Sequence, residues 1–196
     1  MAKLTGTKLV TNEVRASYAQ VFEPASMTDR DSDAKYSISL LVPKEDTETI
    51  ELIEQGIEAA RKGGVEKFGK KFPLKPKTTF RDGDEERPDD PAYAGHMFLN
   101  CSSKTKPGVV KKAPAGSPVK TVEITSEDEF YSGCYCKAAI NFYAYNFNGS
   151  MGIAAGLNNL LFTRDGERFA GKDAAENDFA DELDFEDDGD EPDFLS

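Results

Sequence analysis

One stretch of the sequence, 135–147, alternates two kinds of side chain. Lys137, Asn141, Tyr143 and Tyr145 all stand at odd-numbered positions, and in a β-strand such positions share one face. Aromatic rings on such a face can stack on unpaired bases, and a lysine among them can neutralise a phosphate. The row therefore favours binding of single-stranded nucleic acid. A face that covers part of the hydrophobic core is the alternative.

Lysines also gather in two irregular segments of the chain. Segment 66–77 interleaves five lysines with phenylalanines, and segment 104–120 holds five lysines and no acid. Local charge matters more to a polyanion than the net charge of the protein does. A solvated loop anchored by its phenylalanines is the alternative for the first segment. The candidate DNA contacts in the two segments are Lys67, Lys70, Lys71, Phe72, Lys75, Lys77, Lys104, Lys106, Lys111 and Lys112.

The net charge of −12 comes entirely from the last 24 residues. Segment 173–196 has twelve Asp or Glu and no Lys or Arg, while the preceding 172 residues hold 24 acidic and 24 basic residues. Such a block predicts a disordered interaction tail, and a polyanion with an aromatic residue near its tip can mimic a nucleic-acid strand. A tail that only keeps the protein soluble is the alternative. The candidate partner-binding residues are Asp187, Asp188, Asp190, Glu191, Asp193 and Phe194.

Four residues could in principle form a tetrahedral zinc site: His96, Cys101, Cys134 and Cys136. The one-residue gap between the last two cysteines is not the two-residue gap typical of zinc sites. An odd number of cysteines also fits reduced thiols better than a disulfide framework. We therefore expect structural, reduced cysteines and no metal.

Catalytic chemistry has little support in the sequence. A single histidine leaves little for acid–base or nucleophilic catalysis, and no P-loop, dinucleotide-binding turn or zincin motif occurs. The acidic segment 82–91 is by default a solvated loop. The sequence predicts a protein that is not an enzyme and needs no cofactor. A nucleic-acid enzyme that binds Mg²⁺ through Asp82 or Asp84 remains an alternative.

The elements that must position these residues are mostly strands. Alternation is clearest in 35–42, and a helix is predicted to begin at Asp46 or Thr47 and to end at Gly63-Gly64. Segment 67–91 is predicted to be a long loop with at most short strands. The predicted strands are 7–10, 14–22, 35–42, 97–102, 119–124, 134–147 and 151–162.

This pattern predicts a mainly β fold, with an OB-like β-barrel, one inserted α-helix and long loops as the best fit. A β-sandwich is the alternative. The predicted division is an OB-like domain over 1–172 and a tail over 173–196. No apolar run approaches the roughly 20 residues that cross a bilayer, and the start lacks the apolar stretch of a signal peptide. We therefore expect a cytoplasmic protein without a membrane partner.

Several segments together resemble a family of phage-encoded single-stranded DNA-binding proteins with an OB fold. The resemblance runs from about Gly6 to Phe179, and it adds Arg15 and Tyr18 to the candidate DNA-binding residues. The segments that carry it are 14–24, 36–44, 81–84, 93–96, 102–108, 131–135 and 141–146.

The resemblance implies sequence-independent binding of single-stranded DNA during phage replication or recombination, in the cytoplasm of the host. In phage replication proteins with a similar tail, the tail occupies the DNA groove until DNA displaces it, and it then recruits replication proteins. Here Phe194 is followed by two more residues, so the terminal-aromatic pattern is not perfect. The sequence leaves a homodimer open. A protein-interaction module whose acidic tail mimics DNA and blocks a host nucleic-acid enzyme is the alternative function.

Overall fold

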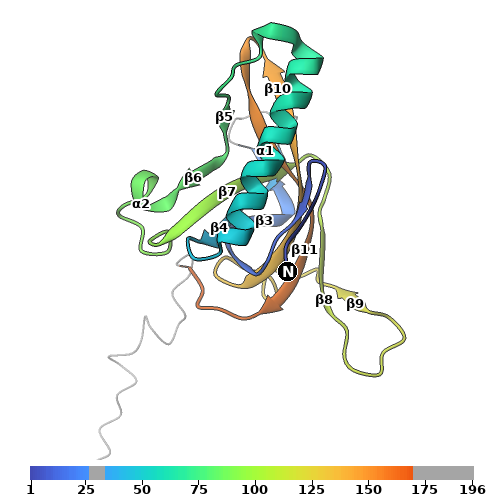
Figure 1. Cartoon of the computed structure of the whole chain (residues 1–196). Coiled ribbons are helices and arrows are strands. Elements are labelled where there is room, and N and C mark those ends of the chain that lie inside the picture. Colours follow the sequence, from blue (N-terminus) through green and yellow to red (C-terminus); the bar gives the residue numbers. More distant parts are fainter. Residues whose placement is uncertain (27–33, 170–196) are drawn as a thin grey trace, which may run out of the picture.

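The computed structural model describes residues 1–26 and 34–169 of the chain (Figure 1). The predicted tail, 173–196, lies outside the described residues together with its six candidate partner-binding residues. Within the described ranges, no helix combines the length and the apolar character needed to cross a membrane.

Five strands close into a barrel. β3 pairs with β4 and β4 with β7, both antiparallel; β7 then runs parallel to β11, and β10 pairs antiparallel with both β11 and β3. A small closed five-stranded barrel of this kind is the OB architecture, so the predicted OB-like fold is confirmed. The barrel strands are β3 (Val14–Ala25), β4 (Lys35–Pro43), β7 (His96–Ser103), β10 (Tyr135–Phe147) and β11 (Ser150–Arg164).

Shorter strands extend this barrel. β2 pairs with β10 on one side and with β1 on the other. β5 runs parallel to β11, and β6 pairs with β7. β8 runs parallel to β11 and pairs with β9, and the two form an arm that projects from the body (Figure 1). These strands are β1 (Lys3–Thr5), β2 (Lys8–Val10), β5 (Lys77–Thr78), β6 (Phe80–Asp82), β8 (Gly108–Lys112) and β9 (Thr121–Glu123).

The inserted helix α1 (Thr47–Phe68) lies along β10 (Figure 1). It begins as predicted, because the Asp46 carboxylate accepts a hydrogen bond from the Thr49 amide at 3.1 Å and caps the first turn. The predicted end at Gly63-Gly64 is wrong, since the helix continues to Phe68 and is followed by the short 3₁₀ helix η2 (Gly69–Lys71).

Gly64 serves close packing rather than helix termination. A Cβ built there would lie 2.8 Å from the Ala144 Cβ and 2.9 Å from the Phe72 ring. Gly56 is equally close to the ring of Phe142. The two glycines let α1 lie directly on the inner side of β10, and Phe72 is buried beneath the helix.

The main core fills the barrel, and a small second core lies outside it. The three cysteines belong to the main core, and burial raises the pKa of the Cys134 thiol to about 11. Within the described ranges, no group of three or more potential ligands could hold a metal ion. Leu41, Tyr93 and Phe98 form the second core, against which Ala92 and Phe169 pack.

The adjacent glycines Gly63 and Gly64 provide a matched pair of variants. Gly64→Ala is expected to lower the free energy of unfolding by about 1–3 kcal/mol, because the added methyl overpacks against Ala144 and Phe72. Gly63→Ala, where nothing lies within 4 Å, is expected to raise it by up to about 1 kcal/mol through helix propensity. Urea unfolding followed by circular dichroism measures both. A Gly64→Ala protein more stable than the parent would contradict the close packing.

Candidate nucleic-acid interface

Small polar side chains line the outward side of two neighbouring barrel strands. Ser39 is the register partner of Asn100, and Ser37 is the partner of Ser102; we call these four residues the β4–β7 face. Gly156 of β11 continues the surface as the parallel partner of Ser102. In OB folds the face of the second and third strands, with the loops beside it, binds oligonucleotides. β4 and β7 are the second and third barrel strands of this chain.

The tyrosine row lies on the outer side of the β10–β11 hairpin, next to this face. Tyr143 is 44% exposed, and its partner on β11 is Ala154. Tyr145 lies over Gly152, where a Cβ would come within 2.6 Å of its hydroxyl. Asn141 lies over Gly156 in the same way. The row therefore forms an outer surface, because α1 packs against the opposite side of β10.

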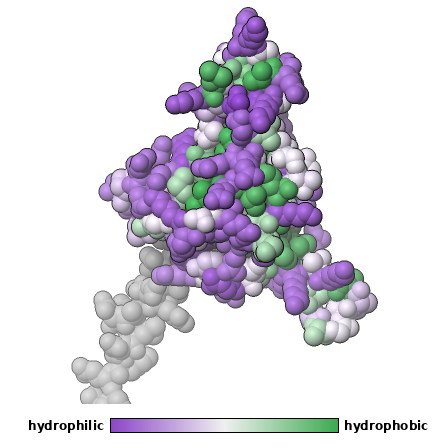
Figure 2. All heavy atoms as spheres, in the orientation of Figure 1, coloured by the Kyte–Doolittle hydropathy of each residue, from purple (hydrophilic) through white to green (hydrophobic). Residues whose placement is uncertain are grey.

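The tip of this hairpin is apolar as well as exposed. Phe147 continues the row at 73% exposure, and Leu74 is 84% exposed. Figure 2 shows apolar patches among mainly hydrophilic residues at this end of the molecule, where α1 ends and the hairpin turns. The exposed Phe147 ring, at the end of the tyrosine row, is suited to stacking.

β3 borders the face on its other side and carries a β-bulge. Tyr18 and Ala19 both lie between Ser17 and Gln20, whereas only Ile38 lies between their partners Ser39 and Ser37, so β3 has one extra residue. Tyr18 lies in the bulge with φ of 46° and a side chain that is 58% exposed. Bulges often re-aim a side chain at a functional site, and here the bulge presents the Tyr18 ring to solvent.

Arg87 contacts this tyrosine, and sequence reasoning missed it. Its guanidinium donates a hydrogen bond to the Tyr18 hydroxyl at 3.2 Å and lies 5.4 Å from the centre of the ring. It also lies 5.0 Å from the ring centre of Tyr93 and 6.0 Å from that of Phe98. No periodic pattern indicates Arg87, because this residue stands in an irregular acidic segment.

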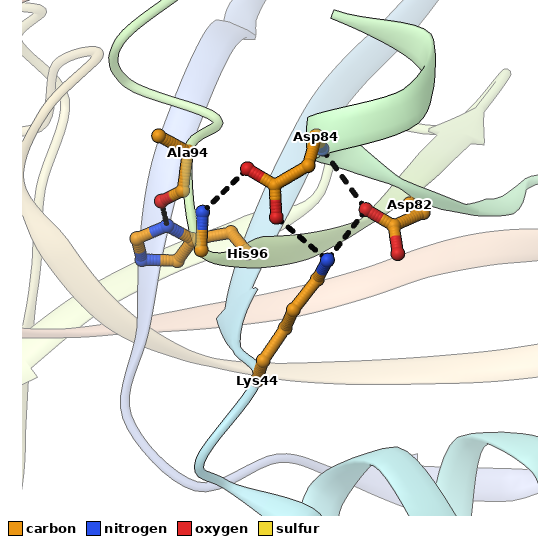
Figure 3. A network of polar contacts seen from close by, with 6 residues as sticks. Lys44, Asp82, Asp84, Ala94 and His96 are labelled. Carbon is orange, nitrogen blue, oxygen red and sulfur yellow. Dashed lines mark hydrogen bonds and ion pairs between the residues drawn. The ribbon is translucent and has the colours of Figure 1, made fainter. Parts of the chain in front are cut away.

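A polar network holds the loop that carries Arg87 (Figure 3). The Lys44 ammonium donates hydrogen bonds to the Asp82 carboxylate at 2.7 Å and to the Asp84 carboxylate at 2.6 Å, and so forms an ion pair with each. Asp84 also accepts a hydrogen bond from the Gly95 amide at 2.9 Å. Asp82 caps the short helix α2 (Gly83–Glu86) by accepting from the Asp84 amide. The network thus joins both ends of segment 83–95 to β4.

The network also changes the acidity of its members. The hydrogen bonds from Lys44 lower the pKa of both carboxyl groups, and those to Asp82 and Asp84 raise the pKa of Lys44. These contacts give the two aspartates a structural role in positioning the loop. The Mg²⁺ alternative gains nothing from them, because both carboxylates are already bonded to an ammonium group.

Arg15 is half-buried, and its side chain is engaged by partners within the protein. Its guanidinium donates to the carbonyl oxygens of Gly133 at 3.0 Å and Glu167 at 2.9 Å. It also lies 4.2 Å from the ring centre of Phe169 and 5.5 Å from that of Tyr135. Arg15 thus holds the last described residues against the barrel, and its predicted contact with DNA stays a prediction.

The predicted basic segments lie in two places. Lys67, Lys70, Lys71, Lys75 and Lys77 are exposed, and Lys77 pairs with Gly152 beneath Tyr145, so this segment borders the tyrosine row. Phe72 is 4% exposed and packs in the core, where its ring is not free to stack.

The second basic segment lies along the β8–β9 arm and the turn before it. Lys104, Lys106 and Lys112 are exposed, and Lys111 forms an ion pair with Glu129. β8 pairs with residues 159–162 of β11, which is the other half of that strand from the part beside Tyr143 and Tyr145. The structure therefore brings the first segment, but not the second, next to the tyrosine row. Lys137 lies on the outer side of β10, opposite Leu161.

The fold and this surface define the class of the protein as an OB-fold protein, and in OB folds in general such a surface binds oligonucleotides or oligosaccharides. The sequence model of a family described as "Enterobacter phage Enc34, ssDNA-binding protein" matches residues 7–192. The chain therefore belongs to this family of phage single-stranded DNA-binding proteins.

Individual relatives agree with this assignment. "Putative protein p50" of Acyrthosiphon pisum secondary endosymbiont phage 1 is 34% identical over 183 residues, which cover 90% of this chain and 94% of the relative. The structure of the bacteriophage Enc34 protein in complex with ssDNA has a TM-score of 0.72 and 26% identity, covering 86% of this chain and 97% of that one. The gp2.5 protein of bacteriophage T7, a single-stranded DNA-binding protein, has a TM-score of 0.55 and 17% identity over 95% of this chain and 97% of its own, a likeness that shows the fold alone.

Asp84→Asn tests the role of the network. We expect faster amide hydrogen exchange across 83–95, because the neutral side chain loses its charge-assisted bond with Lys44. Since the pKa values of both aspartates are lowered on folding, the same loosening is expected as the pH falls below about 4, and not between pH 5 and 8. Glu85→Gln, at an exposed residue of the same helix, is the control. Equal exchange in the parent and Asp84→Asn would contradict this role.

Proposed function

We propose that the protein binds single-stranded DNA without sequence preference, in the cytoplasm of the phage's host and during replication or recombination of phage DNA. The observation that carries this proposal is the β4–β7 face of the OB barrel, bordered by the exposed Tyr18 on β3 and by Tyr143 and Tyr145 on β10. The similarity of this chain to the Enc34 protein, whose structure was determined in complex with ssDNA, supports the same ligand.

The chemistry of the surface explains the absence of sequence preference. Tyrosine rings can stack on any base, and each stacked base contributes about 1–3 kcal/mol. Ser37 and Ser102, which are half-buried, present only small side chains to bases that approach the strands. Lys75 and Lys77, at the edge beside Tyr145, contribute contacts to the phosphates.

We also propose that the acidic tail regulates access of DNA to this surface. Phe169, four residues before the tail begins, packs beside Tyr93 and Phe98, the two rings that Arg87 also contacts. The chain therefore leaves its last described position next to the proposed site. A segment with twelve carboxylates follows four residues later in the sequence, and it competes with a polyanion for the same basic groups. Once DNA displaces it, the tail is free to recruit replication or recombination proteins through Asp187, Asp188, Asp190, Glu191, Asp193 and Phe194.

The tyrosine row is tested by Tyr143→Ala and Tyr145→Ala. Each is expected to weaken binding of a labelled oligo-dT by about 1–3 kcal/mol while the slope of log K against log salt stays unchanged, because stacking releases no counterions. Lys77→Ala is expected to reduce the magnitude of that slope by about 0.7, the value for one phosphate on a single strand. Fluorescence anisotropy across a salt series measures both effects. Thermal unfolding of each variant separates lost contacts from lost folding, and full affinity in both tyrosine variants would contradict the assignment.

The tail is tested by a chain that ends at residue 172, which keeps Phe169 and its contacts. At low salt this truncated chain is expected to bind oligo-dT more tightly than the full chain, and the difference is expected to shrink as salt screens the tail. Equal affinity at low salt would argue against competition. If neither chain binds oligo-dT, the tail is the active element, and the alternative of a DNA mimic that blocks a host enzyme becomes the better explanation.

A further inference from the structure

Arg87 lies among three aromatic rings that come from different parts of the chain. Tyr18 belongs to the bulge of β3, Phe98 to β7, and Tyr93 to the loop before β7. The guanidinium lies within 6.0 Å of each ring centre. Since Leu41 of β4 packs with Tyr93 and Phe98, the cluster lies over the outward side of β3, β4 and β7.

The guanidinium of Arg87 keeps most of its hydrogen-bonding capacity. An arginine side chain has five N–H donors, and in the described part of the chain the only bond from this guanidinium goes to the Tyr18 hydroxyl. Among the described residues no carboxylate forms an ion pair with it, whereas neighbouring Arg81 is paired with Glu86. The remaining donors of Arg87 suit a phosphate, which an arginine can bind through two parallel hydrogen bonds.

Tyr18 is held in an unusual conformation that exposes its ring. Its φ of 46° lies in the left-handed region that non-glycine residues seldom adopt. Such a backbone costs about 1–3 kcal/mol and persists where the surrounding structure imposes it. The ring has Arg87 on one side, and with 58% of the residue exposed it has surface left for a second planar group.

We propose that Tyr18 and Arg87 form a nucleotide subsite, in which an unpaired base stacks on the free face of Tyr18 and Arg87 binds the phosphate next to that base. Tyr93 and Phe98 hold the guanidinium from behind, and the Lys44 network fixes the loop that supplies it. The subsite lies on the β3 border of the β4–β7 face, across from the tyrosine row. It rests on the proposed function and names residues for the second border of that surface.

A tryptophan at position 18 reports stacking directly, because the chain contains none. In the full-length protein, Tyr18→Trp is expected to lose much of its fluorescence on saturation with oligo-dT, as the indole stacks on a base. Gln55→Trp, on the exposed acidic side of α1, is the matched control and is expected to change little. Anisotropy of the labelled oligonucleotide confirms that both variants are saturated. Bound DNA with unchanged emission from position 18 would overturn the subsite.

Affinity measurements cover the case in which tryptophan itself disturbs the bulge. Tyr18→Ala is expected to weaken oligo-dT binding about 5- to 150-fold, the range for one stacked base, and Tyr18→Phe is expected to keep most of the affinity. An unchanged Tyr18→Ala protein would overturn the stacking role. If the parent protein itself fails to bind oligo-dT, the proposed function fails and the subsite with it, and this result differs from a parent that binds while the Tyr18 variants show no effect.

Arg87→Gln tests the phosphate contact, with Arg81→Gln as the control in the same region. Arg87→Gln is expected to weaken binding and to reduce the magnitude of the salt slope by about 0.7, whereas Arg81→Gln leaves the slope unchanged. A weaker Arg87→Gln protein with an unchanged slope would overturn the phosphate contact and assign Arg87 to positioning Tyr18 alone.

Discussion

The parallel pairing of β7 with β11 closes the barrel, and the arrangement of the interface depends on it. Only two residue pairs form it, Cys101 with Ala155 and Ser102 with Gly156. The first pair is buried and joins the core, while the second lies on the outer surface. By this contact β11 brings the tyrosines of β10 next to the serines of β4 and β7. Gly156 is required because Asn141 lies over it, and a Cβ there would be 2.7 Å from the amide oxygen.

The small core outside the barrel joins three segments that are distant in the sequence. Leu41 belongs to β4, Tyr93 to the loop before β7, and Phe98 to β7 itself. Phe169, which packs against them, is the last described residue. The Tyr93 hydroxyl lies 3.2 Å from the Ser17 hydroxyl and 3.3 Å from that of Ser39, so its ring crosses from the loop onto the barrel surface. One small apolar cluster therefore sets the position of the Arg87 loop and also that of Phe169, the last described residue.

Local patterns in the sequence predicted local features well. The alternation in 35–42 placed Ser37 and Ser39 on the outer side of β4, and the row from Lys137 to Tyr145 lies on one face of β10, as expected. The short strands β5 and β6 fit the loop with at most short strands predicted for 67–91, whereas the helical turns η2 and α2 in the same segment were not predicted.

Features that depend on distant contacts could not be predicted in this way. In the sequence alone Gly64 resembles a helix stop, but in the structure it allows close contact with Ala144 and Phe72. Phe72 was a candidate for stacking, but it is buried beneath α1. Arg87 had no signal of its own, because its partners Tyr18 and Phe98 lie 69 and 11 residues away. The body is formally neutral, yet Asp82, Asp84, Glu86 and Glu13 are engaged by basic partners, while Lys70, Lys71 and Lys75 are exposed. Under the proposed function, salt is expected to weaken both the attraction of these lysines for DNA and the competition from the tail, whereas it leaves stacking nearly untouched. In the proposed mechanism the two screened effects oppose each other, and the part of the affinity that does not depend on salt comes from the exposed tyrosines.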